Sequence, residues 1–381
     1  MAIRLLFFVI PFALFQSGAG AATFPENNWC GDSAIVYAGQ MLSLVENGQF
    51  STASDFARSW KQQCGMNEPL FRATALLLIK TGDFPGFLVE EGLLDFAIAW
   101  EIRYRIMVNQ DQDIRDDYYQ VHEAYFGFIP FNSSFDRRTR TMARELLRDA
   151  AHSSLSMAFL RLYSDEPDDF FLMLKEKNID YQPLIDTYQQ RVLSFQKLPE
   201  FNLGISTGLW HPSNHLSSIG LKPAIGVLLG VKWENLMING LFQVRFGNTQ
   251  QPIEILMQDT LTSTRTFQGG FGGIEFSYQL LAMQNHRAGI SLAGGFDLIE
   301  LIDRGQDASR TTFYSPVFQS GVYWGYVFRN RTMVSVHPAY AFLNHTNQPG
   351  SSLAGNALLL NLVFSFSENA RKTENLKRLG Y

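Results

Sequence analysis

The sequence predicts an α + β protein of two domains: an N-terminal all-α domain of helical hairpins in a solenoid-like arrangement, and a C-terminal eight-stranded antiparallel β-barrel. Charge density changes near residue 200. Residues 23–199 contain 25 acidic and 17 basic side chains, whereas residues 200–366 contain nine of each. Apolar residues recur at the helical period of 3.6 before this point and at a period of two after it. We therefore place the domain boundary between residues 199 and 200.

The first 22 residues are predicted to form a secretory signal peptide. Arg4 precedes an apolar run over residues 5–15, and small residues at 18–22 follow, with two alanines in an A-x-A arrangement. A membrane anchor is the alternative, but this run is too short for a transmembrane helix, which needs about 20 residues. We expect cleavage near Ala21 or Ala22 and export of the remaining chain.

The chain contains two cysteines, Cys30 and Cys64, and both follow the predicted signal peptide. An even number of cysteines in an exported protein suggests a disulfide, which for a loop of this size contributes about 3 kcal/mol in the chain-entropy model. Two buried free thiols are the alternative. We expect no metal site here, since no histidine is nearby.

Helical periodicity covers most of the first domain. The predicted helices span residues 35–45, 50–60, 70–81, 88–107, 118–126, 137–162, 168–177 and 181–195. The tripeptide Gly-Gln-Phe at 48–50 returns as Gly-Asp-Phe at 82–84, after 34 residues, and the two cysteines have the same separation. A period of 34 is typical of helix–turn–helix repeats that stack into a solenoid.

Residues 33–100 therefore resemble the tetratricopeptide-repeat class. Gly48, Phe50 and Ala53 occupy the positions where that pattern has glycine, an aromatic residue and alanine. The pattern departs from the class at Gly65, where a proline usually closes the repeat, and a third copy near Asp116 is degenerate. The resemblance implies a concave surface that binds peptides or other proteins. An irregular helical domain is the alternative.

Eight segments with alternating polarity make up the second domain. They span residues 200–210, 220–233, 236–246, 267–281, 288–299, 313–328, 332–342 and 355–366. The second and third, fourth and fifth, and sixth and seventh segments are joined by short turns, and the other connections are longer. This pattern, with strands of about ten residues or more, is typical of barrels that cross an outer membrane. With an even number of strands, both chain ends of the barrel lie on the short-turn, periplasmic side.

Residues 200–366 resemble the small eight-stranded bacterial outer-membrane β-barrel class. The last strand ends in Phe364-x-Phe366, which is similar to the aromatic C-terminal signal of such barrels. Asn361 stands where that signal usually has glycine, and a charged tail at 367–381 follows the strand. The resemblance implies the outer membrane of a Gram-negative cell, contact with its lipid, and a periplasmic location for the helical domain and the tail.

The alternation places six ionisable residues on the inner face of this barrel: Lys222, Lys232, Arg245, Glu275, Asp297 and His337. A charge on the lipid face costs about 2–4 kcal/mol near the midplane, so this distribution favours a membrane barrel. Glu275 and Arg245 lie on neighbouring strands, and we expect that they can pair. Eight strands leave a lumen that side chains fill, so we expect a packed polar interior without an open pore. A soluble barrel or sandwich with its apolar face inside is the alternative.

The sequence offers little sign of catalysis. The first long loop contains His211-Pro212-Ser213-Asn214. The order of these residue types is similar to the His-x-Ser-Asn cluster of lipid A deacylases with eight-stranded barrels. His345 lies in the last loop. A hydrolase needs a nucleophile, a base and an orienting acid, and the sequence does not supply that set. We assign no catalytic residue, cofactor or metal, and the net charge of −5 argues against a nucleic-acid partner.

The functional prediction is an outer-membrane barrel whose helical domain acts as a protein-interaction or envelope-assembly module for an unidentified periplasmic or envelope protein. A lipid A-modifying hydrolase and a narrow channel or transport component are the alternatives.

Overall fold

The computed structural model describes residues 30–84, 92–149, 152–257, 259–302, 310–329 and 331–381. The predicted signal peptide lies outside the described residues. The chain divides into two compact units, Met1–Val192 with Lys377–Tyr381, and Leu193–Leu376. The first unit is helical and the second contains the barrel, as the fold class predicted.

The helical unit is built from short amphipathic helices around apolar cores. Its helices are α1 (Gly31–Glu46), α2 (Phe50–Cys64), α3 (Glu68–Thr81), α4 (Leu93–Asn109), α5 (Gln112–His122), α6 (Ser134–Leu146), α7 (Ser154–Tyr163), α8 (Pro167–Lys175) and α9 (Gln182–Gln196). Local chemistry sets the helix ends. Ser133 and Ser153 accept hydrogen bonds from the first turns of α6 and α7, and Gly82 ends α3 in the left-handed conformation.

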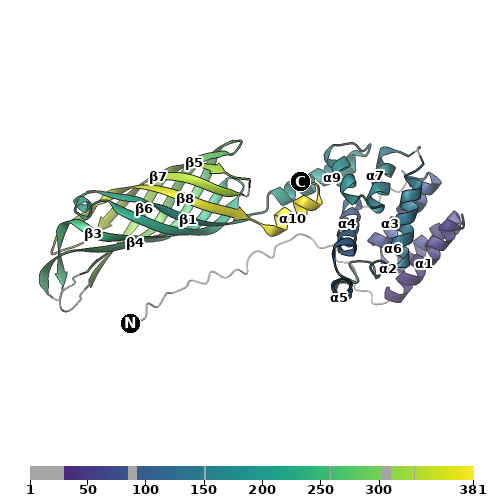
Figure 1. The fold of residues 1–381 in the computed structure, drawn as a ribbon, viewed down its shortest axis with the longest axis horizontal. Helices are drawn as coiled ribbons and strands as arrows, with labels where there is room; N and C mark the ends of the chain where they lie inside the picture. Colours follow the sequence, from purple (N-terminus) through teal and green to yellow (C-terminus); the bar gives the residue numbers. More distant parts are fainter. Residues whose placement is uncertain (1–29, 85–91, 150–151, 258, 303–309, 330) are drawn as a thin grey trace. The chain divides into compact units, whose positions relative to one another are not determined.

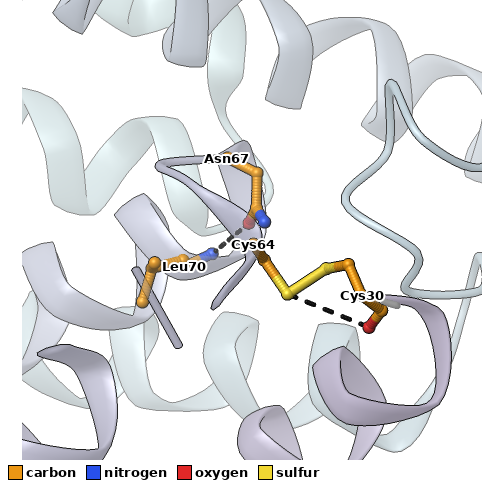
Figure 2. The surroundings of a disulfide bond; sticks show 4 residues. All are labelled: Cys30, Cys64, Asn67 and Leu70. Carbon is orange, nitrogen blue, oxygen red and sulfur yellow. Dashed lines mark hydrogen bonds between the residues drawn. A yellow bond between two sulfur atoms is a disulfide. The ribbon is translucent and has the colours of Figure 1, made fainter. Parts of the chain in front are cut away.

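The predicted disulfide between Cys30 and Cys64 is confirmed (Figure 2). It joins the start of α1 to the end of α2, with Cα atoms 5.2 Å apart. Next to it, the Asn67 side chain accepts a hydrogen bond from the Leu70 amide at 3.1 Å and caps α3. The bond therefore fixes the open end of the first helical hairpin close to the beginning of the next helix.

The 34-residue spacing relates two glycines that each follow a helix. Helices α1 and α2 pack against each other, and both Gly48 and Gly82 adopt positive φ angles, +71° and +82°. The repeat places the start of a second helix at Phe84, but the next α-helix in the described residues begins at Leu93.

The second unit is a closed antiparallel meander (Figure 1). Its strands are β1 (Glu200–Asn214), β2 (Lys222–Trp233), β3 (Leu236–Met257), β4 (Thr260–Met283), β5 (His286–Ile302), β6 (Arg310–Val327), β7 (Thr332–His345) and β8 (Leu353–Glu368). The eight predicted strands are present in the predicted order. The expected loop at 247–266 is wrong, because β3 and β4 continue through most of it as a hairpin. Likewise the tail is not simply a charged extension, since residues 370–378 form α10 (Ala370–Arg378).

The short-turn half of the barrel has an apolar outer face and a polar inner face. Outward-facing Phe276 and Trp324 are 50% and 54% exposed, whereas inward-facing Asn239 and Ser277 are 2% and 0% exposed. A soluble barrel would show the reverse distribution, so that alternative is wrong for this half. The outer face has the composition expected of a surface in contact with acyl chains.

The interior of the loop half is largely apolar, so the expectation of a polar lumen throughout is wrong. Trp210, Phe267 and Ile299 are at most 2% exposed and belong to one hydrophobic cluster. The first loop adds a short helix, η3 (His215–Ile219), whose Leu216 and Ile219 are fully buried against the same cluster. The loop therefore helps to close this end of the barrel.

Among the described residues, no helix combines the length and hydrophobicity that a transmembrane helix requires.

Candidate functional site

The six residues predicted to face the lumen lie along the inner wall of the barrel. Lys222, Arg245, Glu275, Asp297 and His337 are each no more than 8% exposed. Lys232 is half-buried at the short-turn end of β2. The inner wall thus carries ionisable groups along its whole length, and their partners decide what they can do.

Arg245 pairs with Asp297 and not with Glu275, contrary to our expectation. The strand register explains the difference, because Arg245 lies opposite Gly269 on β4, whereas Glu275 lies opposite Asn239 on β3. Glu275 accepts hydrogen bonds from the Asn239 amide and the Ser277 hydroxyl, both at 3.2 Å.

The Arg245–Asp297 pair has two further neighbours that sequence reasoning did not connect to it. The indole ring of Trp210 lies 4.5 Å from the Arg245 guanidinium carbon. His345 Nε2 lies 3.2 Å from the second carboxylate oxygen of Asp297. The alternation of β7 places His345 inward, which is the one sequence signal that could have found this contact.

The structure does not assemble His211, Ser213 and His345 into a hydrolytic site. His345 is 1% exposed and points inward. His211 lies opposite Leu358 on β8, which faces outward, and Ser213 shares that outer face and donates its hydroxyl to the Asn356 carbonyl at 3.1 Å. The serine and the buried histidine are therefore on opposite sides of the barrel wall, where neither could activate the other.

Little free space remains between the lumen side chains. A cavity of about 20 Å³ lies between Ser206, Glu275 and His337, which is the room that about one water molecule needs. The His337 ring is held by a 2.8 Å hydrogen bond with the Ser335 hydroxyl and stacks on Tyr323. This arrangement gives no support to the channel alternative.

A larger pocket of about 240 Å³ lies at the short-turn mouth of the barrel. Its lining includes Lys232, Met237 and Tyr323 from the strands and Lys372 from α10. Lys372 Nζ is engaged by Glu200 Oε1 at 2.8 Å. The mouth therefore combines charged groups of both signs with apolar ones, and α10 contributes one wall.

The helical unit buries a separate ionic cluster. Asp136 binds Arg72 and Arg103 through its two carboxylate oxygens, at 2.9 Å each, and all three side chains are at most 1% exposed. The Arg72 guanidinium lies 4.0 Å above the Trp100 ring. Burial raises the pKa of Asp136, but the two guanidinium groups outweigh it and hold the pKa below its usual value. Every charge in this trio has a partner, so its role is to fix α3, α4 and α6 together.

Helix α5 presents an apolar stripe to solvent. Ile114, Tyr118 and Val121 follow one another at helical spacing and are 52%, 42% and 76% exposed. Asp113, Asp116 and Asp117 are exposed on the same helix. Arg115 anchors α5 by donating to the Met107 carbonyl at 3.0 Å. We call the three apolar residues the α5 stripe.

No cluster of three or more metal-binding side chains occurs among the residues that the structure describes. No protein-family model matches the chain, and no curated protein matches it.

Among solved structures, the barrel is similar to Neisserial surface protein A, with 10% identity over 44% of this chain and 96% of that chain and a TM-score of 0.31. It is also similar to a major outer membrane protein from Thermus thermophilus, with 8% identity over 45% and 99% and a TM-score of 0.32. The attachment invasion locus protein of Yersinia pestis matches with 8% identity over 44% and 97% and a TM-score of 0.26. These similarities concern fold over less than half of this chain, and the conclusions below rest on the chain's own side chains.

Proposed function

We propose that the protein is an outer-membrane β-barrel protein whose helical domain lies in the periplasm and binds another envelope protein. The observation that carries the membrane assignment is the reversed side-chain distribution of the short-turn half. Its strands hold apolar side chains outward and polar side chains inward, and the closed barrel leaves no strand edge that lipid would have to solvate.

Two features favour a periplasmic helical domain. The chain enters β1 and leaves β8 at the end of the barrel that carries the short turns, and in barrels of this class those turns face the periplasm. The Cys30–Cys64 disulfide fits an oxidising compartment.

Membrane fractionation combined with heat-modifiable gel mobility tests the membrane assignment. We expect the protein in the outer-membrane fraction, with an unheated sample migrating differently from a boiled one because the closed barrel resists unfolding by detergent. Recovery in the soluble periplasmic fraction would overturn the proposal.

The α5 stripe supports the interaction role. The stripe has three apolar side chains in one row, each 42% or more exposed. Such rows are common on surfaces that bind partners and rare on surfaces that face only water. The neighbouring aspartates suit a partner that carries basic residues around an apolar patch.

Site-specific photo-cross-linking in intact cells tests this role. A cross-linker at Val121 should give a discrete adduct, while the same group at exposed Thr52 on α2 should give none. The Ile114→Asp substitution should abolish the Val121 adduct, because it places a charge within the stripe. Equal labelling from both positions, or an adduct that survives the substitution, would contradict the interaction role.

A further inference from the structure

Residues 377–381 occupy a site on the helical unit. Leu379 is 1% exposed, although the segment follows the last barrel strand in the sequence. Tyr188 on α9 donates its hydroxyl to the Leu379 carbonyl at 2.6 Å, and Lys175 at the end of α8 donates to the Gly380 carbonyl at 2.8 Å. Two successive main-chain carbonyls are thus bound by side-chain donors from two different helices.

The remaining contacts select particular residues. Gly380 has a φ of +80°, and Phe171 lies 3.7 Å from the position that a Cβ would take. Glycine is the residue that adopts this conformation without strain. The Tyr381 ring lies 4.4 Å from Lys175 Nζ and is 54% exposed.

The receiving residues belong to α8 and α9, and the bound segment comes after the whole barrel in sequence. Tyr188 donates as a neutral phenol, and burial raises its pKa further above neutral pH. Together, two donors to main-chain carbonyls, one buried leucine and one cation–π contact can hold a short peptide segment by its backbone and its side chains.

We propose that α8 and α9 form a peptide-binding site for a Leu-Gly-aromatic segment, that residues 377–381 occupy it reversibly, and that a segment of the same kind in a partner protein can replace them. This inference rests on the proposed function of the helical domain as an interaction module, and it names a second site and the chemistry of its ligand. The segment belongs to the same chain as the site and competes intramolecularly with any added peptide, so the intact chain blocks its own site.

Fluorescence anisotropy with a labelled Lys-Arg-Leu-Gly-Tyr peptide tests the proposal. The purified protein is compared with a chain that ends at Leu376, both in the same lipid nanodiscs. We expect the shortened chain to bind the peptide at least tenfold more tightly than the full chain. A peptide with aspartate in place of leucine should not bind. A folded shortened chain that binds neither peptide, or both equally, would overturn the inference.

Two variants separate peptide binding from a merely structural role of the segment. Tyr188→Phe in the shortened chain should weaken peptide binding about fivefold, since one donor to a carbonyl is lost. Tyr37→Phe on α1 is the matched control and should leave the affinity unchanged. An equal effect of the two substitutions would contradict the assignment of Tyr188.

If circular dichroism shows that the shortened chain is unfolded, the binding experiment uses the full-length Leu379→Ala variant in its place. A tenfold gain in peptide affinity then supports the proposal, and an unchanged affinity overturns it. Cross-linking at Val121 uses a different surface, so loss of peptide binding alone overturns this inference and leaves the proposed function intact.

Discussion

The helical unit and the short-turn half of the barrel place the same residue types on opposite sides of their backbones. In the helical unit Trp60 and Leu70 are fully buried. In the barrel Trp324 is 54% exposed while Asn239 is 2% exposed. This reversal is what the proposed function requires, because a unit in water buries its apolar side chains and a barrel among acyl chains exposes them.

The loop half of the barrel shares an apolar interior with the helical unit, although its outward-facing Phe296 and Leu358 are apolar too and are 66% and 54% exposed. The change of interior occurs within the single strand β4. Phe276 points outward and is 50% exposed, whereas Phe267 points inward and is 2% exposed. On the outer face Gln268 takes the place that apolar residues hold further along the strand. A polar and an apolar interior therefore divide one barrel along its axis, and substitutions at matched positions should separate the environments along it.

The largest expected effect is at Asp297, where the two interiors meet. Asp297→Ala should lower the free energy of unfolding by about 4 kcal/mol, because Arg245 is then buried without its counter-charge. Denaturant unfolding in lipid vesicles, followed by heat-modifiable mobility, measures the loss. The control is Glu254→Ala, an exposed carboxylate in the hairpin extension, where we expect about 0.5 kcal/mol or less. Equal losses for both variants would show that the ion pair does not stabilise the barrel.

The next effect compares two positions on the outer face of β4. Phe276→Arg should cost about 3 kcal/mol, because it places a charge in the apolar band. Gln268→Arg, on the same face and the same strand, should cost close to nothing, because an exposed polar residue already holds that position and Glu300 lies opposite it on β5. The same unfolding assay measures both. If Gln268→Arg were as damaging as Phe276→Arg, the apolar band would extend further than we infer.

Strand number and inner-face residues could be predicted because a period of two fixes the face of every residue once the apolar side is known. The pairing of Arg245 could not, since it depends on register. Glycines at 269 and 273 carry no alternating signal that would fix that register. The hairpin at 247–266 was missed for a related reason: its buried Ile253 and Ile255 are surrounded by residues typical of loops.

In the helical unit, the sequence showed the disulfide but not the ionic cluster. Arg72, Arg103 and Asp136 look like ordinary surface charges in the sequence, and only the packing of three helices brings them together. The position of Leu379 was equally hidden, because nothing local connects the end of the chain to α8 and α9.

The smallest expected effect concerns pH and the two buried glutamates of the helical unit. Burial raises the pKa of Glu68 more than nearby Arg72 lowers it; Arg72 Nε lies 3.0 Å from Glu68 Oε1. Burial also raises the pKa of Glu101, against the effect of Arg105. The folded state therefore binds these protons more tightly than the unfolded state does. The free energy of unfolding should rise as pH falls from neutral through the raised pKa values. The rise should level off below the ordinary glutamate pKa of about 4.3.

Substituting Glu68→Gln should flatten this rise, because the amide has no charge to neutralise. The size of the change follows from about 1.4 kcal/mol for each unit of pKa difference between the two states. Denaturant titrations of the full chain between pH 7.5 and 5, followed by circular dichroism at the helical band, measure it apart from the barrel. Loss of the Asp136 pairing does not interfere, because the pKa of Asp136 is lowered and its contribution is lost only at more acidic pH. Glu145→Gln on the exposed face of α6 is the control. If this control altered the pH dependence as much as Glu68→Gln does, burying a carboxylate in the helical unit would cost no more free energy of unfolding than exposing one.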